Sequence, residues 1–213
     1  AVIDRSFPAR PWEPWPDSGS RGPVVVRERH QAVLSALDIF QQPVGFGGIH
    51  RLVYAAGLLH DDRMFPEKRL EDLTADNLAR AFQVNCVGFG LLVQALSPWF
   101  RGAQLTRVAA ISAKVGSISD NHLGGWYAYR ASKAALNMLL RTAAIEHARR
   151  YPEARLLSLH PGTVVSPLSQ PFRGSAAARP ALQAAAELLA VVDNSKASDS
   201  GSFVAYDGAS VPW

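Results

Sequence analysis

The sequence predicts an α/β fold in which a parallel sheet carries helices on both of its faces. Three observations support this prediction: short apolar runs alternate with longer stretches of helical periodicity, the helical stretches separate successive strand candidates, and several strand candidates end at glycine or proline. Strands joined through helices of this length run parallel to one another. Ligands bind beside the carboxyl ends of the strands in such a doubly wound sheet. Those ends are therefore the first place to look for a site.

Length and composition suit one folded domain. The chain has 213 residues, of which 48% are hydrophobic and 19% are charged, so a sizeable core can form. The formal net charge is +4, but the basic residues are scattered and never form a run of five. We therefore expect no nucleic-acid partner. The single cysteine, Cys86, lies in an apolar helical stretch, which favours a buried thiol in a reducing compartment.

Neither a membrane span nor a signal peptide is expected. No apolar run approaches the roughly 18–20 residues that cross a bilayer. The first residues include Asp4 and Arg5 and have no apolar core. These observations together favour a cytoplasmic protein.

The first 23 residues differ from the rest. Five prolines break any regular element there, and two tryptophans lie among them: Pro8, Pro11, Pro14, Pro16 and Pro23, with Trp12 and Trp15. We predict an irregular Pro/Trp-rich arm over residues 1–23 and a single domain over residues 24–213.

The elements of this domain follow in order. Val24–Val26 is a strand candidate, and residues 28–41 repeat apolar side chains on one helical face. The apolar run 51–57 is a buried strand that ends at Gly57. Thr74 can cap a long helix that continues to about Leu96. Strands over 105–112, 155–160 and 202–206 and helices over 126–150 and 180–193 complete the pattern, and a loop follows residue 114.

Tyr129 and Lys133 form the most informative pair in the sequence. They are four residues apart at the start of a long helix, so they share one face, one turn apart. A free tyrosine has a pKa near 10, and a neighbouring ammonium lowers it by favouring the phenolate. Such a phenol can give a proton to a developing alkoxide or take one from an alcohol. The pair alone is also a common coincidence.

Other residues strengthen that interpretation. The preceding strand ends at Ser112, whose hydroxyl can orient a carbonyl. Asn85 lies inside the earlier long helix, where an asparagine weakens the helix unless its side chain is used. Pro161, Gly162 and Thr163 follow another strand and bring backbone groups to the same edge of the sheet. A cap or a tight turn explains each feature separately, but not all of them in this order.

This arrangement resembles the active site of the short-chain dehydrogenase/reductase family, which has the pattern Ser–Tyr–x–x–x–Lys and an upstream helical asparagine. The segments over 112–121 (SAKVGSISDN) and 124–137 (GGWYAYRASKAALN) look like the C-factor or sniffer-like branch of that family. The tail, with AYDG over 205–208 and a final Pro-Trp, is similar to the end of the same branch. The likeness covers roughly residues 24–213.

The resemblance implies a Rossmann-like sheet and an oxidoreductase that transfers a hydride between NADP or NAD and a small carbonyl or alcohol substrate. Tyr129 would be the general acid, and Lys133 would lower its pKa and hold the nicotinamide ribose. Ser112 would orient the carbonyl, and Asn85 would hold a water in a proton relay. The cofactor would also contact Ala56 and Gly57 on its adenosine side and Pro161, Gly162, Thr163 and Val164 around the nicotinamide. A substrate lid over 165–185 and a homodimer or homotetramer would follow.

Two departures qualify the likeness. Family members often carry a second serine after the strand, where this chain has Ala113, so either Ser112 or Ser117 would serve, and we prefer Ser112. The chain also lacks a recognisable first βαβ unit, whose glycine-rich turn places the cofactor pyrophosphate at a helix N-terminus. The nearest glycines, in GFGG over 45–48, precede a strand instead of opening a helix. The strand that ends at Gly57 lacks the usual asparagine pair.

Three explanations of the missing turn compete. In the first, residues that precede Ala1 in the full protein supply the turn; in the second, the N-terminus is remodelled in a weakly active relative; in the third, residues 1–48 hold the pyrophosphate in another way. We prefer the first, because losing a central strand exposes a costly sheet edge.

Other site types fit less well. A serine hydrolase needs a nucleophile elbow, usually Gly-x-Ser-x-Gly, which is missing. The six histidines show no metal-ligand spacing and are expected at the surface or in loops, so no metal is expected. The serious alternative is a catalytically impaired relative that acts as a binding or scaffold protein.

Overall fold

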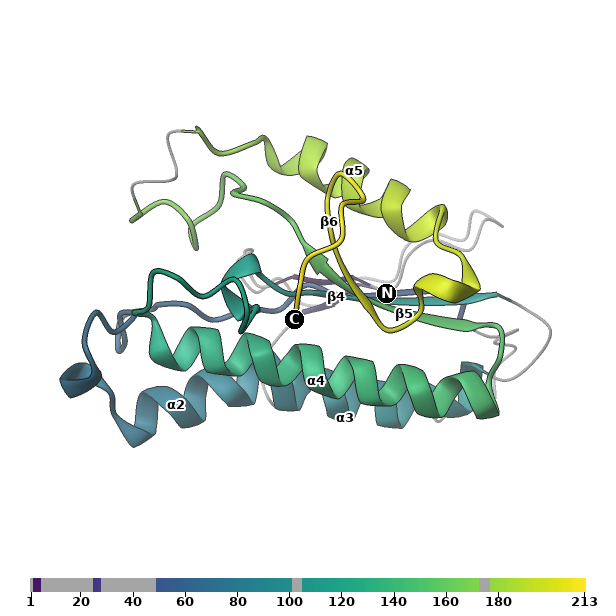
Figure 1. Cartoon of the computed structure of the whole chain (residues 1–213), viewed down its shortest axis with the longest axis horizontal. Coiled ribbons are helices and arrows are strands. Elements are labelled where there is room, and N and C mark those ends of the chain that lie inside the picture. Colours follow the sequence, from purple (N-terminus) through teal and green to yellow (C-terminus); the bar gives the residue numbers. More distant parts are fainter. Residues whose placement is uncertain (1, 5–24, 28–48, 101–104, 173–176) are drawn as a thin grey trace.

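The computed structural model describes residues 2–4, 25–27, 49–100, 105–172 and 177–213 (Figure 1). Its centre is a parallel sheet with the strand order β2-β1-β3-β4-β5-β6. Four of these strands carry the functional region: β3 (Arg51–Tyr54), β4 (Thr106–Ile111), β5 (Ala154–His160) and β6 (Ser202–Ala205). Every strand pair is parallel. The predicted parallel sheet is thus confirmed.

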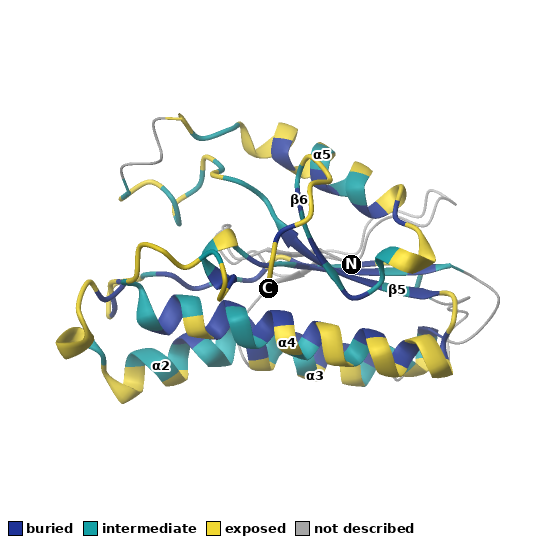
Figure 2. Cartoon of the chain, in the orientation of Figure 1, coloured by how far each residue is buried: buried dark blue, intermediate teal, exposed yellow. Residues whose placement is uncertain are grey.

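Helices cover both faces of the sheet. Figure 1 shows α2 (Ala75–Phe82), α3 (Gly88–Leu96) and α4 (Tyr127–Arg150) on one face and α5 (Ala181–Asp193) on the other. In Figure 2 the buried residues of α4 lie toward the sheet and its exposed residues point away from it. This three-layer arrangement is the doubly wound architecture that the sequence predicts.

The larger core lies between the sheet and α3 and α4. Buried apolar side chains from strands and helices meet there, including Leu52, Phe89, Leu92, Val108, Leu136, Leu140 and Leu156. A smaller cluster on the other face joins Leu157 and Leu159 of β5 to Leu188 and Val192 of α5. Because β4 and β5 are covered on both sides, their sequences are almost continuously apolar.

The long helix predicted over 74–96 is interrupted. Thr74 caps α2 as expected, since its hydroxyl accepts from the backbone N–H of Asn77 at 3.2 Å. A π-helical turn, η2 (Gln83–Val87), then separates α2 from α3. Such turns are frequent at functional sites. Asn85 lies inside this one.

The helical run Ala75–Phe100 is long and apolar enough to cross a membrane by length and composition. This finding differs from the expectation that no apolar run approaches the length of a membrane span. Phe89, Leu92, Val93 and Leu96 of this run are buried in the larger core. The core helices of folded domains pass the same test, and we interpret the run in that way.

The N-terminal residues only partly fit the expected arm. Val2–Asp4 form β1, which pairs with both β2 (Val25–Arg27) and β3, so these three residues belong to the sheet. Val2 and Ile3 are β-branched, which suits a strand, and the prolines that indicate an arm begin only at Pro8. The rest of the predicted arm and the helix predicted over 28–41 lie outside the described residues.

Candidate active site

Helix α4 brings Tyr129 and Lys133 to the carboxyl end of β4. Both side chains are buried, at 7% and 2% exposure. The Lys133 amine donates to the carbonyl oxygen of Ile111, the last residue of β4, at 2.8 Å. The same nitrogen lies 5.8 Å from the centroid of the Tyr129 ring. The predicted pair is therefore confirmed as a neighbouring pair, held against the end of a strand.

Burial controls the charge state of both groups. It raises the pKa of the Tyr129 phenol above its ordinary value and lowers the pKa of Lys133 to about 7, although Cys86 opposes the second shift. This result differs from the expected lowering of the tyrosine pKa by lysine. The physical reason is that an amine with a pKa near neutrality carries only part of its charge, while desolvation opposes the phenolate throughout. At neutral pH the Tyr129 phenol is therefore protonated.

Asn85 joins the loop after β3 to helix α4. Its Oδ1 accepts from the backbone N–H of Leu58 at 2.7 Å, and its Nδ2 donates to the Leu58 carbonyl oxygen and to Ser132 Oγ, both at 2.9 Å. Ser132 in turn donates to the carbonyl oxygen of Tyr129. Both amide hydrogens of Asn85 are thus used, and a relay water would have to donate to the second lone pair of Oδ1. That water remains a prediction.

Gly57 lies beside Asn85 and the start of α4. A Cβ placed on Gly57 would be 3.7 Å from Lys133 Nζ and 3.8 Å from Asn85 Oδ1. The end of β3, the π-helical turn and α4 therefore meet at one point. Ala56, its neighbour, is buried. The structure brings together Gly57, Asn85 and Lys133 as predicted.

The two candidate serines differ in their contacts. Ser112 is 2% exposed, and its hydroxyl has no hydrogen-bond partner among the described residues. The Ser117 hydroxyl, in contrast, accepts from the backbone N–H of Asp120 at 3.1 Å. A buried hydroxyl without a partner is costly, and a ligand atom would relieve that cost. The contacts favour Ser112 over Ser117.

The end of β5 is joined to the end of β4 by His160. Its Nδ1 accepts from the backbone N–H of Lys114 at 3.1 Å. Burial, Lys114 and Arg179 lower the pKa of His160 to about 4, so the ring is neutral at physiological pH. The segment that follows includes Gly162 at φ +69°, where a Cβ would lie 3.0 Å from the Tyr206 ring. Arg179 stacks on that ring and donates to the carbonyl oxygen of Pro161.

The strands therefore place Pro161, Gly162, Thr163 and Val164 at the same edge of the sheet as Ser112. Thr163 is exposed, and Val164 forms a bridge with Arg179. The Arg179 contacts hold this segment against the end of β6. Arg179 could not be recognised from the sequence, because it is a lone basic residue in an irregular stretch.

The first part of the predicted lid lies over the site. The carbonyl oxygen of Leu168 is 3.1 Å from His60 Nε2, and its side chain is 3.9 Å from the Cβ position of Gly57. Phe172 packs against Trp126, with ring centroids 4.9 Å apart, and Trp126 contacts Tyr129. Phe172 also packs against Phe65, so a chain of neighbouring rings extends from Tyr129 through Trp126 and Phe172 to Phe65.

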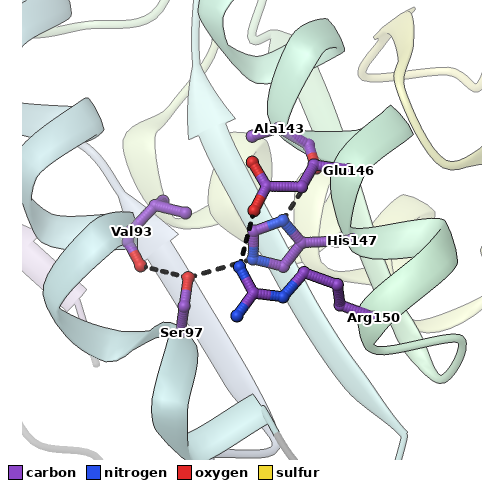
Figure 3. A network of polar contacts seen from close by, with 6 residues as sticks. All are labelled: Val93, Ser97, Ala143, Glu146, His147 and Arg150. Atoms are coloured by element: carbon purple, nitrogen blue, oxygen red, sulfur yellow. Dashed lines mark hydrogen bonds and ion pairs between the residues drawn. The ribbon is translucent and has the colours of Figure 1, made fainter.

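A buried histidine, His147, fixes the far end of α4 (Figure 3). His147 is 4% exposed, and its Nδ1 and Nε2 lie 2.7 Å from the Ala143 carbonyl oxygen and 3.0 Å from Ser97 Oγ. The expectation that each histidine lies at the surface or in a loop is therefore wrong for His147. The reason is that Ser97 and Ala143 supply polar partners inside the core. This contact ties the C-terminal half of α4 to the end of α3.

The comparisons agree with the geometry. A family model described as enoyl-(acyl carrier protein) reductase matches residues 32–211. The C-signal protein of Myxococcus xanthus is 37% identical over 145 residues, which make up 68% of this chain and 83% of that protein. A 1-hydroxy-2-glutathionyl-2-methyl-3-butene dehydrogenase of Rhodococcus sp. (strain AD45) is 33% identical over 141 residues, which are 66% of this chain and 61% of that enzyme.

A solved structure has the same fold. An NADPH-bound carbonyl reductase from chicken fatty liver aligns with a TM-score of 0.76 at 23% identity, over 89% of this chain and 77% of that one. On the family model, the relatives and the shared fold, this chain belongs to the NAD(P)-dependent short-chain dehydrogenase/reductase family.

Proposed function

We propose that the protein catalyses hydride transfer between NADPH or NADH and a small carbonyl substrate, with Tyr129 as the general acid. The observation that carries the proposal is the meeting of Tyr129, Lys133 and the unpartnered Ser112 hydroxyl around the end of β4. These three groups can bind a carbonyl oxygen and protonate it.

The protein groups divide the work as follows. The Ser112 hydroxyl donates to the substrate carbonyl oxygen and fixes its direction. The Tyr129 phenol, kept protonated by burial, gives its proton to that oxygen as it becomes an alkoxide. When protonated, Lys133 keeps two N–H bonds beyond the one given to Ile111, and these can hold a ribose hydroxyl and stabilise the phenolate that remains. The dinucleotide, when bound, supplies the hydride.

The residues at the nicotinamide end fit a dinucleotide. With only a hydrogen at Gly57, the backbone there leaves Lys133 Nζ and Asn85 Oδ1 within reach of a ligand. Pro161–Val164 would line the nicotinamide, and Ala56 would flank the adenosine side. Residues 5–24, which follow β1, lie outside the described residues, and the first glycine after Asp4 is Gly19.

The lack of a glycine directly after β1 favours a second candidate function. A relative that cannot bind the pyrophosphate of the cofactor would keep the fold and act as a binding or scaffold protein. The name of the C-signal relative is also compatible with a role other than turnover.

Cofactor binding distinguishes the two candidates. NADPH that binds only the folded chain raises the melting temperature, by the equivalent of about 2.7 kcal/mol at a hundredfold excess over Kd. We expect a shift with NADPH or NADH, and oxidation of the reduced cofactor when carbonyl compounds are added. ATP serves as a control for adenine binding alone. The absence of a shift at saturating NADPH and NADH would favour the scaffold.

We also propose that α3 and α4 form an interface between copies of the chain. A Cβ on Gly90 would lie 3.0 Å from the Leu139 side chain, so the two helices pack closely there. The adjacent Leu91 and Met138 are nevertheless 48% and 68% exposed. Light scattering should show a dimer or tetramer that Met138→Glu dissociates, and a monomeric wild type would contradict this proposal.

A further inference from the structure

The chain enters α4 through an unusual backbone path. Gly124, Gly125 and Trp126 have φ values of +64°, +65° and +52°. The left-handed region is costly for a side chain as large as that of Trp126. Trp126 is the N-cap of α4, but its side chain makes no capping hydrogen bond. The first turn of α4, which carries Tyr129 as its third residue, therefore needs support from elsewhere.

Glu67 supplies that support from the segment between β3 and α2. Its Oε2 accepts from the backbone N–H of Ala128 at 3.2 Å, and its own carbonyl oxygen accepts from Trp126 N at 2.5 Å. Ala128 is the second residue of α4, where a helix N–H has no partner within the helix. A negative charge at this end of a helix is also favoured by the helix dipole. Glu67 thus caps α4 from a distance of 61 residues in sequence.

The burial of Glu67 shows that this contact is specific. The residue is only 3% exposed, and its Oε1 has no hydrogen-bond partner among the described residues. A carboxylate loses much of its hydration when buried in this way. An exposed glutamate would serve a surface role without that cost. The carboxylate is therefore held at this place by the turn that it caps.

The contact bears directly on the reacting group. Tyr129 follows Ala128, and its ring packs against Trp126 with centroids 6.2 Å apart. Ala128, which precedes Tyr129, and Trp126, whose ring packs against it, are thus both bonded to Glu67. If the turn frays, the phenol loses its place beside Lys133.

We propose that Glu67 is the positioning residue of Tyr129: by capping the first turn of α4, it holds the phenol at the site of proton transfer. This proposal rests on the proposed function.

Variants at Glu67 distinguish the effect of its side-chain length from the effect of its charge. Glu67→Gln keeps an oxygen for the Ala128 N–H and places its amide nitrogen where Oε1 has no partner among the described residues. Glu67→Asp keeps the charge but is one methylene shorter, and Glu67→Ala removes both. Glu71→Gln is the control, because Glu71 is an exposed carboxylate in the following short helix.

With a carbonyl substrate, we expect kcat to fall by about 10²-fold in Glu67→Ala and Glu67→Asp, because small displacements of a catalytic group cost that much. The KM should change by less than about threefold, and Glu67→Gln should stay near wild type. If Glu67→Ala fails to fold, the comparison of Asp with Gln decides. Equal kcat in Glu67→Asp and Glu71→Gln would overturn the proposal.

A measurement without turnover keeps this test distinct from the test of the proposed function. In NMR spectra the Ala128 amide should exchange at least about tenfold faster in Glu67→Asp than in wild type. The Tyr129 ring resonances, identified by comparison with Tyr129→Phe, should shift in Glu67→Asp but not in Glu67→Gln. An inactive wild type with these changes would refute the proposed function alone. Unchanged exchange and unchanged ring resonances would refute the role of Glu67.

Discussion

Lys133 is bonded to the carbonyl oxygen of Ile111 at 2.8 Å while its nitrogen lies 5.8 Å from the centre of the Tyr129 ring. The lysine is therefore fixed by the backbone at the end of β4 and not by the phenol. No hydrogen bond of the described residues engages the Tyr129 hydroxyl, so the proposed substrate oxygen can bond to it. This arrangement also explains why burial, and not an ion pair, decides the protonation of both groups.

Removing the phenol oxygen should abolish turnover and spare the fold. Tyr129→Phe keeps the buried ring and its contact with Trp126. We expect kcat to fall by about 10³-fold, as the loss of a general acid commonly causes. Oxidation of NADPH with a carbonyl substrate measures this loss, and thermal unfolding checks the fold. Activity near that of wild type would rule out Tyr129 as the acid.

Alanine at each serine should separate their roles. Ser112→Ala removes a buried hydroxyl without a partner among the described residues, so stability should hold while kcat falls at least about tenfold. Ser117→Ala removes an acceptor from the Asp120 N–H, so stability should fall by about 1 kcal/mol with little change in kcat. Urea unfolding and initial rates measure both effects. The reverse pattern would identify Ser117 as the serine that orients the substrate.

Two glycine variants should behave in opposite ways. A Cβ at Gly57 meets its nearest atoms at 3.7–3.9 Å, so Gly57→Ala should change stability by less than about 0.5 kcal/mol. It should nevertheless weaken the melting-temperature shift caused by NADPH, because the methyl group enters the proposed cofactor path. A Cβ at Gly116 would lie 2.7 Å from Lys133 Cβ and 3.0 Å from the Lys133 carbonyl carbon, so Gly116→Ala should cost about 1–3 kcal/mol. An unchanged NADPH shift in Gly57→Ala would place the cofactor elsewhere.

The buried Lys133 should make stability depend on pH. Its pKa is about 7 in the folded chain, below the ordinary value of 10.5. Between these values the unfolded chain binds a proton that the folded chain does not, so stability rises with pH. Relative to Lys133→Met, wild type should gain about 1 kcal/mol per pH unit from about pH 7 to 9. Below pH 7 the difference should level off.

Urea titrations of both proteins across this range measure the difference in unfolding free energy. The shifts of Tyr129 and Cys86, whose pKa values are raised, largely cancel in the comparison because both groups remain in Lys133→Met. A constant difference between pH 7 and 9 would show that the Lys133 pKa is not lowered.

Much of the candidate site could be predicted because the spacing of its residues in the sequence is characteristic. Tyr129 and Lys133 share a helix face at i and i+4, and parallel strands place their carboxyl ends at one edge. That rule alone brings Ser112 and Pro161–Val164 into the same region. The apolar runs of β4 and β5 likewise follow from their burial on both faces.

The remaining features depend on contacts between residues that are far apart in the sequence or whose pairing the spacing does not predict. Glu67 caps α4 across 61 residues, and His147 meets Ser97 across 50. The π-helical turn contains Asn85, whose amide bonds to Leu58 and Ser132, whereas periodicity alone predicts one continuous helix there. Val2–Asp4 are too short a run to be recognised as a strand without their partners in β2 and β3.

The hydrogen bonds of Asn85 have a consequence for how this site can diversify. They join the loop at Leu58 to α4 at Ser132, so the elements that hold the proposed catalytic residues form one connected unit. The predicted lid contacts this unit through the His60–Leu168 contact and through packed rings. Substitutions of lid residues that do not pack against Trp126 can therefore change which molecules enter without disturbing the proposed proton transfer. New substrate preferences in descendants of this chain should arise first between Val165 and Phe172.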